Sequence, residues 1–98
     1  MKVTVKTIMQ VFNVNRDKIR QVKAQQLFIV DTPYLGRLLV SYRTIVGAFH
    51  DGVWVISLEK HSVTTSRQIN GFIRSTPFEV QRVDAETFSD LLDGIARE

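Results

Sequence analysis

Residues 36–72 read GRLLVSYRTIVGAFHDGVWVISLEKHSVTTSRQINGF, and this stretch decides the fold because it holds a long hairpin followed by a helix. Its pattern predicts strands over Gly36–His50 and Val53–Glu59, joined by Asp51-Gly52. A two-residue Asp-Gly loop favours a type I′ turn, whose twist matches that of the flanking strands. The turn sets a register that pairs His50 with Val53, Phe49 with Trp54, Gly47 with Ile56, and Ile45 with Leu58.

This register divides the hairpin into two faces. The face that we expect to form the core is uniformly large and apolar: Ile45, Phe49, Trp54, Ile56 and Leu58. The other face grows polar toward Tyr42, Thr44 and Glu59, so we expect it to be wetter. Its apolar members Val46, Ala48 and Val55 would then be exposed and would suit a partner or a dimer. Gly47 is expected to let a bulky neighbour approach closely.

The polar segment after the hairpin predicts the start of a helix. Thr65 and Gln68 match a capping box, and Ser75-Thr76-Pro77 ends the helix because the residue before proline avoids helical geometry. The same segment allows a second interpretation, in which hydroxyls, backbone donors and a cation hold a phosphate or carboxylate. Capping alone accounts for most of the pattern. The candidate anion-binding residues are Thr64, Thr65, Ser66 and Arg67.

The flanking segments complete one domain over residues 1–98. Apolar spacing predicts a helix over residues 3–12, with a strand over Lys2–Lys6 as the alternative. A strand from about Val22 to Asp31 begins as an exposed arm, and its part Leu27–Val30 is expected to pair antiparallel with Leu38–Tyr42. Downstream, residues 78–83 alternate as a strand, and Asp84 caps a last helix. The buried stripe of that helix is Phe88, Leu91, Leu92 and Ile95.

The predicted fold class is therefore α+β. We expect a small antiparallel sheet of about four strands with helices on one face, in the order α-β-β-β-α-β-α.

Composition argues against several function classes. The chain has 98 residues and no cysteine, which excludes a disulfide scaffold and cysteine-ligated zinc. Its clearest apolar runs have four residues, so we expect a protein of the cytoplasm with no membrane span. His50 and His61 fall near opposite ends of one strand, roughly 20 Å apart at 3.3 Å per residue. With no nucleophile–base pair or phosphate loop, we expect no enzyme activity, metal or cofactor.

Charge is distributed unevenly along the chain. Residues 1–78 carry eleven Lys or Arg against four acids, whereas residues 79–98 carry two Arg against six acids. One interpretation is an acidic helix that solvates a mildly basic domain; the other is a basic surface that receives an anionic partner. The densest basic cluster is the segment from residue 16 to residue 23. Its cations are Arg16, Lys18, Arg20 and Lys23, and we expect Arg37 and Arg43 on neighbouring strands.

Three motifs within residues 30–73 form a distinctive combination: SYRTIVGAF, DGVWVI and TTSRQINGF. Together they resemble a class of small uncharacterised proteins encoded mainly by phages and related mobile elements. The resemblance implies origin and fold and brings no established activity. Given a phage origin, the small size, the absence of catalytic groups and the asymmetric charge suit a binding protein that contacts a host protein or ribonucleoprotein complex, including an inhibitor of a defence such as CRISPR.

On this hypothesis, the acidic last helix occupies a basic channel of the partner as a substitute for phosphates. The residues expected to bind the partner are Glu86, Asp90, Asp93, Tyr42 and Arg43. One alternative is direct nucleic-acid binding by the basic segment, with affinity that falls as salt rises. The other is a structural or self-associating phage component, which would include a homodimer.

Overall fold

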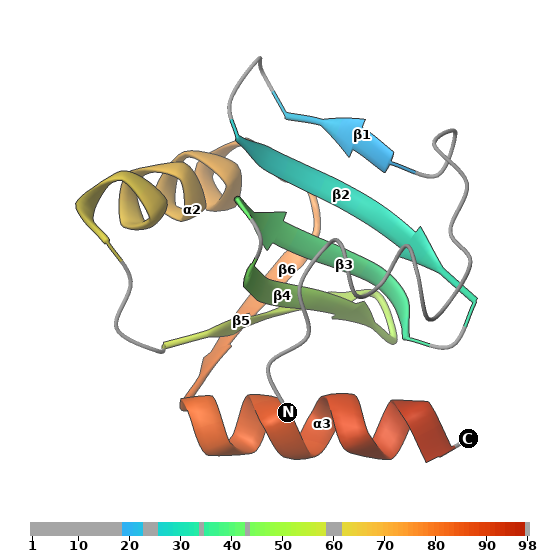
Figure 1. The fold of residues 1–98 in the computed structure, drawn as a ribbon. Coiled ribbons are helices and arrows are strands. Elements are labelled where there is room, and N and C mark those ends of the chain that lie inside the picture. Colours follow the sequence, from blue (N-terminus) through green and yellow to red (C-terminus); the bar gives the residue numbers. More distant parts are fainter. Residues whose placement is uncertain (1–18, 23–25, 34, 43, 59–61, 98) are drawn as a thin grey trace.

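The computed structural model describes residues 19–22, 26–33, 35–42, 44–58 and 62–97. Within them the chain forms one six-stranded sheet whose strands lie side by side in sequence order, from β1 to β6 (Figure 1). The elements are β1 (Ile19–Gln21), β2 (Leu27–Thr32), β3 (Gly36–Ser41), β4 (Thr44–His50), β5 (Val53–Ser57), α2 (Val63–Ser75), β6 (Glu79–Val83) and α3 (Ala85–Arg97).

The sheet is mixed. Strands β1 to β5 follow one another by antiparallel pairing, whereas β6 pairs parallel with β5. A parallel neighbour needs a crossover connection, and α2 supplies it. After β6 the chain turns directly into α3, which lies on the other face of the sheet from α2 (Figure 1).

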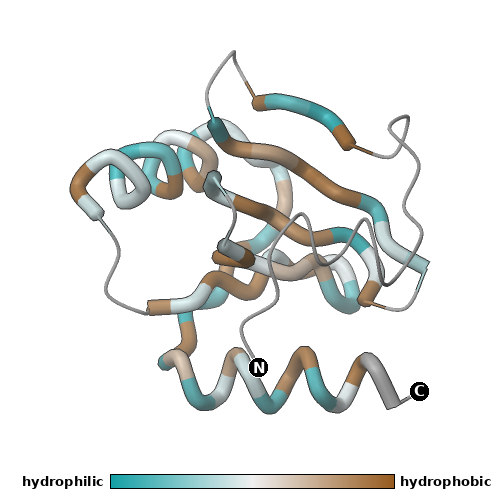
Figure 2. Tube along the Cα trace, viewed as in Figure 1, coloured by the Kyte–Doolittle hydropathy of each residue, from teal (hydrophilic) through white to brown (hydrophobic). Residues whose placement is uncertain are grey.

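Each face of the sheet buries its own core, because successive side chains of a strand point to opposite faces. The core under α2 contains Leu27, Leu39, Val46, Trp54, Ile56, Ile69 and Phe72. The core under α3 contains Val30, Leu35, Leu38, Val40, Ile45, Ala48, Val55 and Phe88. Figure 2 shows the result, with hydrophobic residues along the inner strands and alternating character along α3.

The predicted Asp51-Gly52 turn is confirmed. Both residues have positive φ, 51° and 79°, as a type I′ turn requires. The pairs nearest the turn are those expected: His50 with Val53, Phe49 with Trp54 and Gly47 with Ile56. Gly47 does permit close approach, since a Cβ built there would lie 2.7 Å from Ile56 Cδ1. The pairing of Leu27–Val30 with the strand that begins at Gly36 is also confirmed.

The prediction of a four-stranded sheet with helices on one face is wrong. The segment Gly36–His50 is two antiparallel strands, because the chain turns back between Ser41 and Thr44. Tyr42 adopts a positive φ of 55° there. The turn contains no glycine, asparagine or proline from which it could have been predicted. A further strand, β1, pairs with β2 where an exposed arm was expected. The expected helix over residues 3–12 lies outside the described residues.

The expected register of the hairpin fails beyond Gly47. Leu39 pairs with Gly47 but Val40 pairs with Ile45, so Val46 is an extra residue that forms a bulge. The bulge moves Ile45 into the core under α3, and Leu58, its expected partner, is 59% exposed.

The second face of the hairpin is not wetter, as was expected. Val46 is buried under α2, while Ala48 and Val55 are buried on the α3 side. A helix on each face of the sheet explains the difference, because both faces of β4 and β5 then require apolar residues.

Among the described residues, no helix is both long and apolar enough to cross a membrane.

Candidate binding site

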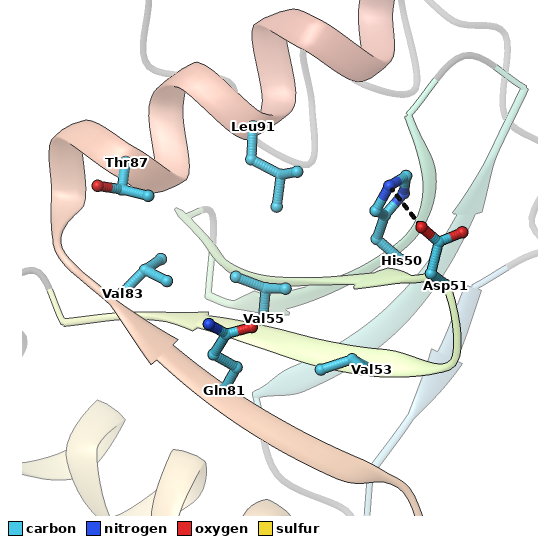
Figure 3. A pocket seen from close by; sticks show the side chains of 8 residues that line it. All are labelled: His50, Asp51, Val53, Val55, Gln81, Val83, Thr87 and Leu91. Atoms are coloured by element: carbon cyan, nitrogen blue, oxygen red, sulfur yellow. Dashed lines mark ion pairs between the residues drawn. The ribbon is translucent and has the colours of Figure 1, made fainter.

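A cleft of about 350 Å³ opens between α3 and the sheet (Figure 3). Its apolar wall comes from β5, β6 and α3, in the side chains of Val53, Val55, Val83 and Leu91. Its polar groups come from the hairpin tip, β6 and α3, in the side chains of His50, Asp51, Gln81 and Thr87. An apolar wall with a few polar groups at its edge is the usual composition of a small binding site.

The type I′ turn places His50 and Asp51 together at one end of the cleft. His50 Nε2 lies 3.3 Å from Asp51 Oδ2, and the Asp51 side chain is 88% exposed (Figure 3). Because the turn has only two residues, the hairpin tip holds this carboxylate close to the apolar wall. The carboxylate therefore gives the mouth of the cleft negative charge.

The start of α3 is positioned by its cap. Asp84 Oδ1 accepts a hydrogen bond of 2.7 Å from the Thr87 backbone N–H. Hydrogen bonds from the Thr87 hydroxyl and then from its backbone N–H lower the pKa of Asp84 from its ordinary value of 3.8. The cap thus ties Thr87, which lines the cleft, to the end of β6, and it confirms the predicted role of Asp84 as the cap.

The outer side of α3 carries an acidic ridge, which consists of Glu86, Asp90 and Asp93. Their spacing of four and three residues places them on one face of the helix, and all three are exposed. The opposite side of α3 packs on the sheet through Phe88, Leu91, Leu92 and Ile95, as the spacing predicted. Among the side chains that the structure describes, no cation forms an ion pair with the ridge.

The other helix carries the opposite charge. Arg67 and Arg74 lie seven residues apart on the exposed side of α2, which contains no acid. Since α2 and α3 cover opposite faces of the sheet, the exposed charges described on these two helices are positive on one face and negative on the other.

The candidate anion-binding residues at α2 are engaged in capping and packing. The N-cap is Ser62 and not Thr65, because Ser62 Oγ accepts from the Thr65 N–H at 3.1 Å. The Ser66 N–H donates to the Ser62 carbonyl at 2.9 Å. Of the four residues, Thr64 and Arg67 are exposed, Ser66 is half-buried and Thr65 is buried. The backbone donors of Thr65 and Ser66 are thus already used within the helix.

A chain of hydrogen-bonded hydroxyls explains why Thr65 points inward. Ser41 at the end of β3 donates to Gln68 Oε1 at 2.7 Å and lies 3.1 Å from Thr65 Oγ1. Ser62 in turn donates to Thr65 Oγ1 at 3.1 Å. Two residues of the TTSRQ motif, Thr65 and Gln68, therefore serve to attach α2 to the sheet.

The remaining predicted site residues do not gather at the ridge. Tyr42 is exposed at the turn after Ser41, whose hydroxyl bonds to α2, so Tyr42 lies beside α2 and apart from the ridge. Arg20 is exposed on the edge strand β1. Arg43, Arg16, Lys18 and Lys23 lie outside the described residues.

Sequence reasoning missed the cleft. Its wall depends on β6 pairing with β5, and the alternating pattern of residues 78–83 does not reveal which strand will be its neighbour. The Asp-Gly turn and the spacing of α3 were the available signals, and neither indicates that the hairpin tip faces the helix. Within the described part of the chain, no group of three His, Cys, Asp or Glu side chains is arranged to hold a metal ion.

The fold and the site define a small α+β domain with a helix on each face of its sheet and an open cleft beside an acidic helix. The chain belongs to a family of unknown function, DUF8033, whose model matches residues 7–89. Neither the curated proteins nor the solved structures contain a significant match.

Proposed function

We propose that this chain is a non-enzymatic binding protein that acts by contact with a protein partner through the α3 side of the molecule. The observation that carries the proposal is the acidic ridge, which faces outward while the apolar side of the same helix is used by the core. From the motif resemblance we further propose that this is a phage protein that acts in the cytoplasm of the host cell. Its target would be a host complex, including a CRISPR complex.

Electrostatics supports a basic partner. Three exposed carboxylates on one helical face attract a positively charged surface and speed its encounter with the helix. Host complexes that bind nucleic acid present such surfaces to phosphates. A row of carboxylates at helical spacing would compete for the same surface.

The test is capture of host proteins on the immobilised chain, with charges reversed on one helix at a time. We expect Glu86→Lys, Asp90→Lys and Asp93→Lys together to abolish capture, because the ridge would then repel the partner. The matched control is Arg67→Glu with Arg74→Glu, which reverses the exposed charge of α2 and should leave capture unchanged. Circular dichroism of both variants checks that the fold is retained.

Two results would redirect the proposal. Capture that survives reversal of the ridge contradicts it. Captured material that disappears on nuclease treatment favours the alternative of nucleic-acid binding by the basic segment that includes Arg20. The third alternative, self-association, has lost the observation that favoured it, since Val46, Ala48 and Val55 are buried. Light scattering that showed a large stable oligomer would restore it.

A further inference from the structure

The cleft adds an apolar wall to the α3 side of the molecule, since α3 contributes both to the cleft and to the acidic ridge. Thr87 and Leu91, which line the cleft, are four residues apart and lie on one side of α3. Asp90 of the acidic ridge lies three residues after Thr87, so the two side chains are neighbours on the surface of α3.

The described charges around the cleft are predominantly negative. Asp51 lies at the hairpin end, and Asp84, the cap of α3, lies at the start of that helix. Arg82 neighbours Gln81 but points to the opposite face of the sheet, because side chains alternate along β6. Among the charged side chains on the cleft wall and ridge, His50 is the one that can carry positive charge, and it already pairs with Asp51.

We propose that this cleft receives one apolar side chain from a basic segment of the protein partner. The wall of three valines and Leu91 accepts the apolar side chain, and the ridge with Asp51 binds the flanking lysines or arginines. The volume of about 350 Å³ accommodates a single large side chain with room for part of its backbone. This inference rests on the proposed function and names the chemistry that the α3 side recognises.

The test uses three labelled pentapeptides, KKLKK, KKSKK and EELEE, titrated into the 98-residue chain. We expect KKLKK to bind about tenfold more tightly than KKSKK, because only the leucine side chain gains by leaving water. Methyl resonances of Val53, Val55 and Leu91 should shift with KKLKK, while those of Ile69 and Ile73 under α2 should not. EELEE should not bind.

Two substitutions on β6 provide a matched pair. Gln81→Trp places an indole in the cleft and should remove the advantage of KKLKK over KKSKK. Arg82→Trp adds the same side chain on the α2 face and should leave that advantage intact. Since both positions are exposed and tryptophan favours strands, we expect both variants to fold.

The outcomes separate this inference from the proposal on which it rests. Equal binding of KKLKK and KKSKK, lost when the ridge is reversed, overturns the role of the cleft and leaves the ridge as the contact surface. Binding of EELEE as tightly as KKLKK overturns the requirement for a basic segment. Failure of every peptide to shift the cleft methyl resonances also overturns the inference, whereas the proposed function is judged by capture of host proteins.

Discussion

Single side chains hold this small sheet to its helices, and Ser41 is the clearest example. It is 2% exposed, yet its hydroxyl has partners on both sides: it donates to Gln68 and accepts from Thr65. Hydrogen-bonded hydroxyls polarise one another in a chain, so the relay that begins at Ser62 acts as a unit. The relay places the first two turns of α2 over the end of β3.

Removal of the Ser41 hydroxyl should therefore be costly. We expect Ser41→Ala to lower the free energy of unfolding by about 1–3 kcal/mol, because Gln68 Oε1 would remain buried without its donor. Urea unfolding followed by circular dichroism measures the change. Ser89→Ala, on the exposed side of α3, is the control and should change stability by less than about 0.5 kcal/mol. Equal effects of the two substitutions would show that the relay contributes nothing.

The charge of Asp84 should make stability depend on pH. Its pKa is lower in the folded chain than the ordinary value of 3.8, so the folded state holds the proton less tightly than the unfolded state. The resulting stabilisation is fully present above about pH 5 and is lost as pH falls through the lowered pKa.

The matching variant is Asp84→Asn, which keeps an N-cap but cannot ionise. We expect the wild-type chain to be more stable than this variant at pH 7, and the difference to disappear toward pH 2. Thermal unfolding across this range makes the comparison. A difference that does not change with pH would exclude the contribution of the charge.

Among the elements, the hairpin of β4 and β5 shows best what the sequence could and could not predict. Asp51-Gly52 predicted the turn, and the turn then fixed which residues of β4 and β5 pair, as far as Gly47. The bulge at Val46 had no such signal, because an apolar residue suits either face of a sheet that is covered on both sides. The turn after Ser41 was missed for a related reason: Tyr42 and Arg43 are uncommon turn residues, and the chain reads as one continuous strand.

Gly47 is a point of close approach in this hairpin. A Cβ there would lie 2.7 Å from Ile56 Cδ1 and 3.3 Å from Leu39 Cβ. We expect Gly47→Ala to destabilise the fold by about 1–3 kcal/mol through overpacking. In the background of Ile56→Val, which removes the Cδ1 atom, the same substitution should cost less, and urea unfolding of the four chains measures the coupling. If Gly47→Ala lowered stability equally in the two backgrounds, a clash with Ile56 Cδ1 would not be the cause.

Helix α3 was the most predictable element, yet its position explains why the prediction of helices on one face of the sheet was wrong. Its apolar stripe and its Asp84 cap follow from local spacing. The face of the sheet on which α3 packs cannot be predicted from local spacing. It depends on the parallel pairing of β6 with β5, which the sequence of neither strand indicates. The acidic side chains were thus identified from the sequence, while the cleft beside them emerged only from the assembled structure.

For the whole molecule, the two helices separate charge as well as cores. The exposed side of α2 carries Arg67 and Arg74, and the exposed side of α3 carries Glu86, Asp90 and Asp93. A partner that recognises charge will distinguish the two faces, since the sheet and its two cores lie between them. The acidic face alone combines its charge with the cleft described above.

The most direct test of this polarity is photo-crosslinking from each face inside host cells. A photoreactive amino acid would replace Ser89 on α3 or, as the control, Asn70 on α2. Both are exposed polar residues beside the exposed charged residues of their helices. The acidic-face model predicts a discrete host protein crosslinked from position 89 and none from position 70. A host protein crosslinked from position 70 alone would contradict it.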